Sequence, residues 1–260
     1  MRNSPPWSPV RRHADRRLGV RLAVAAGAVV VAALPVTLLG VLVLAAWDPL
    51  RDLDETAARG LHDAVVGHPV AVDVLEAWTN VFSPWPFRLA VVAMAGWLIH
   101  RGAPRLAAWA LVTIVTGGVL GVLAKALVGR ARPHLPHPVA HAPGASFPSG
   151  HALTATLGCG ILLLALLPVL HGRWRTLAWT LAVVLPLCTG MTRIALGVHW
   201  VSDVIGGWLL GIAVVLATAT GFEAWRRDVG RTPGRPGRTG VEPEAAAELE
   251  SPGPHRGGSH

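Results

Sequence analysis

Two polar segments of the 260-residue chain hold most of the side chains whose types and spacing could do chemistry. The segments contain Lys125, Arg132, Pro133, Ser149, Gly150 and His151, and then Arg193, His199 and Asp203. Lysine offers phosphate a point charge, and arginine a planar fork of N–H donors. If the helix before Lys125 continues, Arg132 follows on the same face and Pro133 ends it. These two cations predict an anion site.

The segment Ser149-Gly150-His151 stands where an apolar run begins. Ser149 suits the N-cap of a helix, and the free backbone N–H groups of a helix start attract phosphate. Gly150 lets the backbone approach a ligand closely. The sequence therefore predicts that backbone donors add to the cations.

His199 and Asp203 are four residues apart, so we expect them to share a helical face near the start of the last apolar run. A carboxylate on one imidazole nitrogen leaves the other free as a nucleophile or base. A lone His–Asp pair is commonly structural, and arginines near helix ends, such as Arg130, commonly reach lipid headgroups. Together with Arg193, however, the convergent groups favour phosphoryl transfer, which rests on positioning and charge stabilisation.

Composition indicates which elements must position these groups. The chain is 52% hydrophobic and only 15% charged, against about 25% charged in soluble domains. Six runs lack Asp, Glu, Lys and Arg: 22–47, 89–100, 106–124, 152–170, 176–192 and 204–222. A spanning helix needs roughly 20 apolar residues, so the short second run must extend backward through Pro86 or across Arg88. We expect an all-α polytopic membrane protein, a bundle of six transmembrane helices.

The charges predict orientation and domain limits. Arginines gather in the N-terminal arm, in loops 100–105 and 171–175 and in the C-terminal segment, whereas 48–76 is acidic. The positive-inside rule then puts both termini in the cytoplasm and loops 48–84, 125–151 and 193–203 outside. We expect a basic cytoplasmic arm (1–19), a six-helix membrane domain (20–225) and a disordered cytoplasmic tail (226–260), because the tail has few large apolar groups. The net charge of +8 is thus explained without nucleic acid.

Three motifs together resemble the signature of the type-2 phosphatidic acid phosphatase superfamily. They are Lys125-x6-Arg132-Pro133, Pro148-Ser149-Gly150-His151 and Arg193-x5-His199-x3-Asp203. The third motif usually begins Ser-Arg; here Thr192 precedes Arg193 and keeps the hydroxyl. The resemblance implies a six-helix membrane phosphatase that needs no metal or other cofactor.

By position, the resemblance implies a role for each residue. His199 would be the nucleophile that forms a phosphohistidine, Asp203 would orient it, and His151 would protonate the leaving oxygen. The phosphate-binding residues would be Lys125, Arg132, Arg193, Ser149 and Gly150. The expected partners are the lipid bilayer and a membrane lipid substrate, such as phosphatidic acid or undecaprenyl diphosphate. Alternatives are a lipid phosphotransferase of the same fold and a non-enzymatic lipid-binding or carrier protein.

A second histidine pattern, His134-x2-His137-x3-His141, has the residue types of a zinc triad. It lies in a proline-rich loop rather than on a helix, and no fourth ligand is evident. Ordinary loop histidines are the favoured interpretation, and we expect no metal site.

Overall fold

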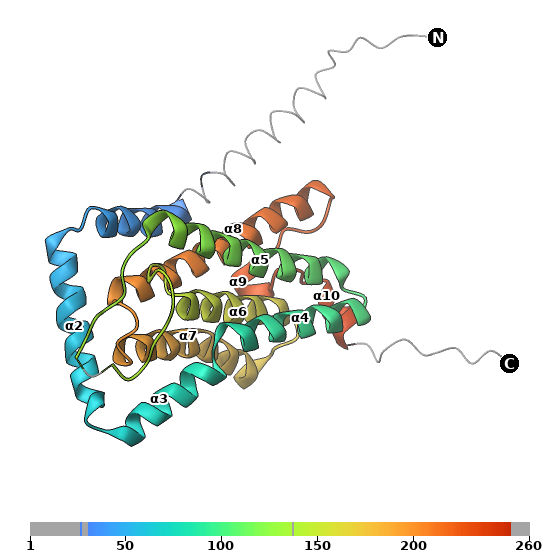
Figure 1. Ribbon diagram of the computed structural model, residues 1–260. Coiled ribbons are helices and arrows are strands. Elements are labelled where there is room, and N and C mark those ends of the chain that lie inside the picture. The colour runs from blue at the N-terminus through green and yellow to red at the C-terminus, as the bar shows by residue number, and fades with distance from the viewer. Residues whose placement is uncertain (1–26, 28–30, 137, 251–260) are drawn as a thin grey trace, which may run out of the picture.

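The computed structural model describes residues 27, 31–136 and 138–250 (Figure 1). After a first helix, Val31–Leu44, the main helices are α2 (Asp48–Val66), α3 (Pro69–Val81), α4 (Pro84–His100), α5 (Pro104–Val128), α6 (Gly150–Leu166), α7 (Gly172–Ala195) and α8 (Val201–Asp228). Two short helices follow, α9 (Pro236–Thr239) and α10 (Ala245–Glu250). The described residues contain no strand, which confirms the all-α class.

The apolar runs form long helices. Among the described residues, four candidates are long and apolar enough to cross a membrane: Pro69–His100, which includes α3 and α4, and the helices α5, α7 and α8. The first helix and α2 pass the same test together but meet at an angle of 91°. Helix α6 is apolar and has 17 residues, the lower end of the roughly 17 to 25 that span a bilayer. The chain is therefore a polytopic membrane protein, and the count of six spans stays a prediction.

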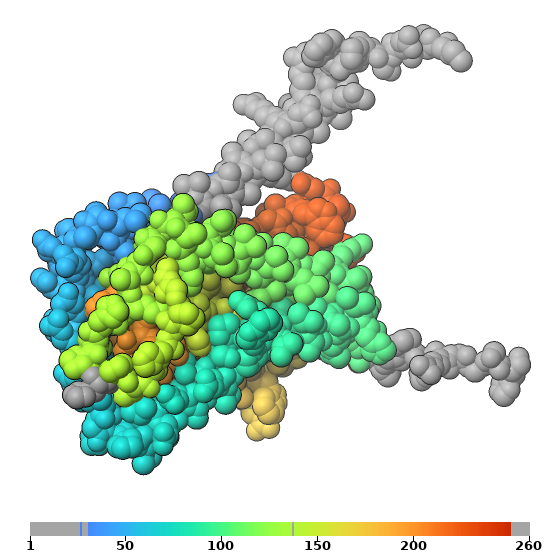
Figure 2. Space-filling model, in the orientation of Figure 1, coloured from blue at the N-terminus to red at the C-terminus, as the bar shows by residue number. Residues whose placement is uncertain are grey.

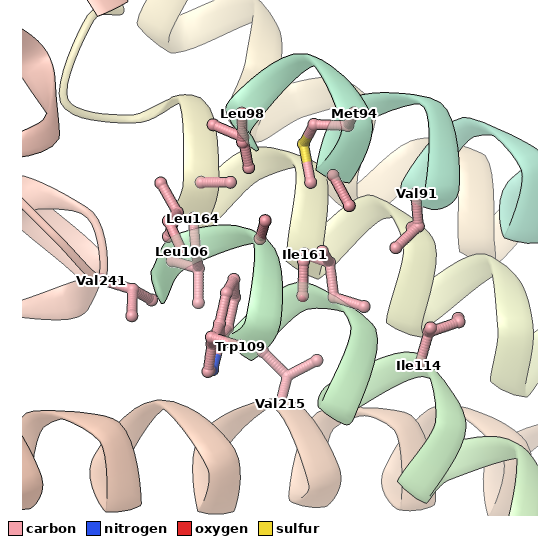
Figure 3. Close-up of a cluster of buried hydrophobic side chains, with 14 of the residues drawn as sticks. Val91, Met94, Leu98, Leu106, Trp109, Ile114, Ile161, Leu164, Val215 and Val241 are labelled. Carbon is pink, nitrogen blue, oxygen red and sulfur yellow. The ribbon is translucent and has the colours of Figure 1, made fainter. Parts of the chain in front are cut away.

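Helix α6 is the centre of the bundle. It contacts α4, α5, α7 and α8, and eleven of its residues are buried. The largest buried cluster surrounds it, with Met94 and Leu98 from α4, Trp109 from α5, Ile161 from α6 and Val215 from α8 (Figure 3). Because lipid tails are as apolar as these side chains, the helices associate mainly through close packing.

Glycines allow α8 to approach α6 closely. A Cβ atom on Gly207 would lie 2.7 Å from the carbonyl oxygen of Ser149, and one on Gly211 would lie 2.7 Å from the Cβ of Thr156. The two glycines are four residues apart, the spacing at which small residues bring membrane helices together. This contact fixes the first turn of α6 against α8.

The expected outer loop 48–84 is instead mostly helical. Helix α2 lies across one end of the bundle, and α3 leads from it into α4 (Figure 1). Helix α2 buries Asp54, Ala58 and His62, which recur every four residues along one face. A polar carboxylate on this face is thereby placed over the ends of α7 and α8, which α2 contacts.

The segment after α8 differs from the expected disordered tail up to residue 250. Val241, Ala245 and Leu249 belong to the main buried cluster, and the N–H of Val241 donates to the carbonyl oxygen of Leu164 (3.3 Å). Arg226 at the end of α8 is 1% exposed and pairs with Glu223 (2.7 Å) and Glu244 (2.6 Å). The segment is thus packed on the bundle through three apolar side chains and these ion pairs. Residues 251–260 lie outside the described residues, as does the whole of the expected arm (1–19).

Candidate active site

Lys125 and Arg132 meet, although not on one helix. Gly129 adopts the left-handed conformation (φ 58°) and ends α5, so Arg132 lies in the following loop rather than in a continued helix that Pro133 ends. The Nζ of Lys125 donates to the carbonyl oxygen of Ala145 (2.6 Å), and an Nη of Arg132 donates to the same oxygen (3.3 Å). The predicted pair of cations is thus brought together by the fold of the loop.

Arg132 is held mainly by backbone carbonyls. Its Nε donates to Gly144 (3.0 Å), and its two Nη atoms donate to Pro143 (3.0 Å) and Val198 (2.8 Å). The Nη that contacts Val198 also lies 3.2 Å from the Nε2 of His199. Five contacts therefore fix the guanidinium beside the imidazole.

The His199–Asp203 pair forms across a helix start. His199 precedes α8, and its Nδ1 lies 3.3 Å from Asp203 Oδ2. The same oxygen accepts the N–H of Trp200 (2.9 Å), which fixes the carboxylate at the third position of α8. Both side chains are buried. When the Nδ1 proton is donated to Asp203, the Nε2 lone pair of His199 faces Arg132.

Three further residues, which the sequence analysis did not select as site residues, form a hydrogen-bonded cluster with Asp203 of this pair. Arg130 donates to Asp203 Oδ1 (2.9 Å), to Ser202 Oγ (2.6 Å) and to Asp54 Oδ2 (2.7 Å). Asp54 in turn accepts from the N–H (2.8 Å) and the hydroxyl (2.5 Å) of Ser202. The interpretation of Arg130 as a headgroup contact is therefore replaced by a buried ion pair. The four-residue spacing of Asp54, Ala58 and His62 was the signal that could have identified α2.

The start of α6 lies beside this cluster. The N–H of Ser149 donates to the carbonyl oxygen of Asp203 (2.9 Å). Ser149 occupies the N-cap position, but within the described residues its Oγ has no hydrogen-bond partner and does not cap the helix. The first N–H groups of α6, from Gly150 onward, are therefore not taken by that side chain. The half-buried His151 interacts electrostatically with Lys125, Arg132, Arg193 and His199, so all the predicted groups converge.

Arg193 completes the set from the last turn of α7. It is buried, and one Nη donates to the hydroxyl of Thr79 on α3 (3.0 Å), another residue that the sequence did not indicate. Its Nε has no partner among the described residues. A buried guanidinium with an unused donor is suited to bind an anion.

Burial shifts the pKa values of His199 and Arg132, which both lie in loops at the site. Burial lowers the pKa of His199 to about 4, and although Asp203 opposes this shift, Arg132 and Arg193 add to it. His199 is therefore neutral at pH 7, with a lone pair available on Nε2. Burial also lowers the pKa of Arg132 from its ordinary value, against the opposing charge of Asp203.

The histidine-rich loop encloses a cavity of about 390 Å³ next to this site, because Arg132 lines it together with His62, His134, His141 and Gly197. Figure 2 shows the green-yellow loop around a hollow. Within the described part of the chain, no three His, Cys, Asp or Glu side chains are placed to hold a metal ion. His137 lies outside the described residues, so the predicted lack of a zinc triad is not tested there.

Comparisons with known proteins cover the same region. The model of the PAP2 superfamily matches residues 106–227. Undecaprenyl-diphosphatase of Sulfolobus acidocaldarius is 31% identical over 123 residues, 44% of this chain and 54% of the relative. Phosphatidylglycerophosphatase B of Bacillus subtilis is 29% identical over 63% of this chain and 80% of the relative. Lipid A 1-phosphatase of Rhizobium johnstonii is 36% identical over 45% of this chain and 48% of the relative. The chain thus spans about half the length of the first and third of these relatives.

The fold is also found in a solved structure. The crystal structure of a transmembrane PAP2 type phosphatidylglycerolphosphate phosphatase from Bacillus subtilis superposes with a TM-score of 0.63. The match covers 78% of this chain and 98% of the other, at 24% sequence identity. The two chains share a fold over most of the helical bundle.

Proposed function

Since this chain belongs to the PAP2 superfamily through residues 106–227, we propose that it is an integral membrane phosphatase that hydrolyses a lipid phosphate or an isoprenoid diphosphate. The observation that carries the proposal is the position of His199. Its Nδ1 faces Asp203 (3.3 Å) and its Nε2 faces Arg132 (3.2 Å), so the nitrogen away from Asp203 points at one of the proposed phosphate-binding cations. This is the arrangement that in-line attack on a bound phosphoryl group requires.

Substrate binding would change the partner of Arg132. In the structure, an N–H of Arg132 points at the Nε2 of His199. A phosphoryl oxygen is a stronger acceptor than an imidazole lone pair because it carries negative charge. It would therefore take over this N–H and free Nε2 for attack. Lys125, Arg193 and the N–H groups at the start of α6 would bind the remaining oxygens.

The chemistry then takes two displacements. His199 Nε2 forms a bond to phosphorus as the bond to the lipid oxygen, or to the lipid monophosphate of a diphosphate, breaks, and His151 gives that leaving oxygen a proton. Water then attacks the phosphohistidine, gives a proton back to His151, and the N–P bond breaks. Phosphorus leaves as inorganic phosphate, and the imidazole returns to its neutral form with Nδ1–H donated to Asp203. The nearby cations offset the charge on the transferred group in both displacements.

The position of the site favours a lipid substrate. Lys125, His151, Arg193 and His199 lie at the ends of α5, α6, α7 and α8 that meet on one side of the bundle. A phosphate bound there can keep its hydrocarbon chains in the bilayer. We propose that this is the extracytoplasmic side, because the positive-inside rule assigns the arginine-rich opposite ends to the cytoplasm. The relatives named as undecaprenyl-diphosphate and phosphatidylglycerophosphate phosphatases support the substrate class.

The test is a substrate panel with the purified protein in detergent: phosphatidic acid, phosphatidylglycerophosphate and undecaprenyl diphosphate. We expect release of inorganic phosphate by the wild type and loss of turnover in His199→Ala. His100→Ala, an exposed histidine at the opposite end of α4, is the matched control and should retain wild-type turnover. We also expect an acid-labile covalent phosphate on the wild type and none on His199→Ala.

Other outcomes would overturn the proposal. Phosphate that appears on a second lipid instead of in solution would identify a phosphotransferase. Binding of these lipids without any turnover would identify a carrier. For the orientation, Ala142→Cys in a background without Cys159 and Cys188 should react with an impermeant thiol reagent from outside the cell, whereas Arg173→Cys should not. The reverse pattern would refute the proposed side.

A further inference from the structure

Asp54 is the only described residue before α3 that contacts the proposed catalytic residues through a hydrogen-bonded cluster. It lies on α2, outside the region that matches the PAP2 superfamily model. Its side chain is 1% exposed, and it bonds to Arg130 in the loop after α5 and to Ser202 in the first turn of α8. Burying a carboxylate costs free energy unless the charge is paired. We therefore asked what Asp54 contributes at this position.

The contacts form a chain of charges that ends at the nucleophile. The guanidinium of Arg130 bridges two carboxylates, with one Nη on Asp54 (2.7 Å) and the other on Asp203 (2.9 Å). Asp203 in turn faces His199. Both carboxylates are fully buried, and the side chain of Arg130 is 16% exposed. Screening by water is therefore weak, and the charges interact strongly.

The charge balance of this cluster depends on Asp54. With two carboxylates and one guanidinium, the group Asp54–Arg130–Asp203 carries one net negative charge. Without Asp54, Arg130 would neutralise Asp203, and the cluster beside His199 would have no net charge. Since His199 gains positive charge as its Nε2 bonds to phosphorus, a net negative charge next to Nδ1 stabilises that state.

We propose that Asp54 is a positioning residue for His199, which acts by keeping Arg130 from neutralising Asp203; this inference rests on the proposed phosphatase function. Asp54 also accepts the N–H of Ser202 (2.8 Å) and so holds the first turn of α8, from which Asp203 projects. Helix α2 thereby contributes to catalysis without touching the substrate.

The first test compares Asp54→Asn with Asp52→Asn, an exposed carboxylate on the same helix. In metal sites, loss of a residue that orients a ligand typically costs about 10- to 100-fold in activity, and we expect the same order for a residue that orients the His199–Asp203 pair. For Asp54→Asn we expect a fall of this order in kcat with little change in KM, since the phosphate-binding cations are untouched. Asp52→Asn should match the wild type, and Asp54→Glu should recover part of the loss.

The decisive variant restores the charge. Asp54→Asn with Arg130→Gln leaves Asp203 as the only charge of the cluster, again one net negative charge. We therefore expect the double variant to have a higher kcat than Asp54→Asn alone. A purely structural role predicts the opposite, because the second substitution removes further hydrogen bonds. If Asp54→Asn does not fold, the double variant alone decides: a kcat within about 10-fold of the wild type supports the inference, and a lower one overturns it.

The outcomes separate the inference from the proposed function. Wild-type kcat in Asp54→Asn, or a double variant that is slower than the single one, overturns the role of Asp54 while the phosphatase stands. A wild-type protein that turns over none of the three lipids refutes the phosphatase and this inference with it. That result is obtained before any variant of Asp54 is made.

Discussion

The substitution Gly207→Ala tests directly whether the close packing of α8 against α6 positions the site. Gly207 lies on α8 opposite the first turn of α6, and the new Cβ would meet the carbonyl oxygen of Ser149 at 2.7 Å and the backbone nitrogen of Leu153 at 3.0 Å. Both contacts are with backbone, which cannot rotate away. The two helices must therefore separate at the turn that carries Ser149, Gly150 and His151.

The expected effect follows from the size of that separation. An ordinary carbon–oxygen contact needs about 3.4 Å, so the first turn of α6 has to move by roughly 0.7 Å. Overpacking of this kind destabilises proteins by about 1–3 kcal/mol. A displacement near 1 Å of groups that hold a reacting phosphate can cost about 100-fold in rate. We expect Gly207→Ala to lose activity by one to two orders of magnitude, roughly.

The measurement is kcat on the best lipid substrate, with the midpoint of thermal unfolding in the same detergent. Gly211→Ala is the matched control one turn deeper. Its Cβ would meet the side chain of Thr156 at 2.7 Å, away from the catalytic groups. Gly211→Ala should lower the unfolding midpoint but leave kcat close to that of the wild type. A Cβ on Gly118 of α5 would have no neighbour within 4 Å, so Gly118→Ala should lower neither kcat nor the unfolding midpoint.

Two results would refute this reasoning. If Gly207→Ala retains wild-type kcat and unfolding midpoint, the contact between α6 and α8 is not as close as described. If Gly207→Ala and Gly211→Ala lose activity equally, the loss reports general destabilisation rather than displacement of the first turn of α6.

Three further predictions concern pH, metal and the C-terminal segment. Because the pKa of His199 is lowered to about 4, His199 stays roughly 90% neutral at pH 5, where an ordinary imidazole would be about 3% neutral. After correction for substrate titration, kcat/KM should therefore fall less than about 2-fold from pH 7 to 5, and a fall near 25-fold would contradict the lowered pKa. Dialysis against EDTA should leave kcat unchanged, because Lys125, Arg132 and Arg193 would meet the phosphoryl charge; loss restored by zinc would contradict this. Arg226→Met should destabilise the protein by roughly 1–3 kcal/mol, because Glu244 loses its charged partner and Glu223 keeps only Arg227 and the N–H of Gly234, whereas unfolding of the exposed Arg235→Met control should match the wild type.

The spans could be predicted from the sequence because their signal is local. The run 106–124 corresponds to α5, 176–192 to α7 and 204–222 to α8, each extended by a few residues at its ends. The short run 89–100 extends backward to Pro84, as its length required. Helix ends were harder to place, since Gly129, rather than Pro133, ends α5. The amphipathic α2 and the packed segment 231–250 were missed because partners distant in the sequence stabilise them.

The site residues could be predicted from local sequence, whereas the residues that hold them in place could not. Types and spacing alone selected Lys125, His151 and His199, since phosphate chemistry needs cations and an imidazole wherever the chain folds. Their catalytic roles stay predictions until the variants are made. Spacing could place Asp54 on the buried face of α2, but no local pattern shows that Asp54 and Thr79 reach Arg130 and Arg193 from helices far away in the sequence.

The sequence by itself determined the membrane class, the apolar helices and the chemical identity of the candidate site. These depend on hydropathy and on side-chain functional groups, which are properties of each residue or of a short run of residues. Only the tertiary structure decided that Arg132 approaches His199 from a loop, that α2 covers the site and that Arg130 bridges two buried carboxylates. Those arrangements depend on contacts between segments separated by 66 or more residues, and no local pattern encodes which distant partner a buried charge will find.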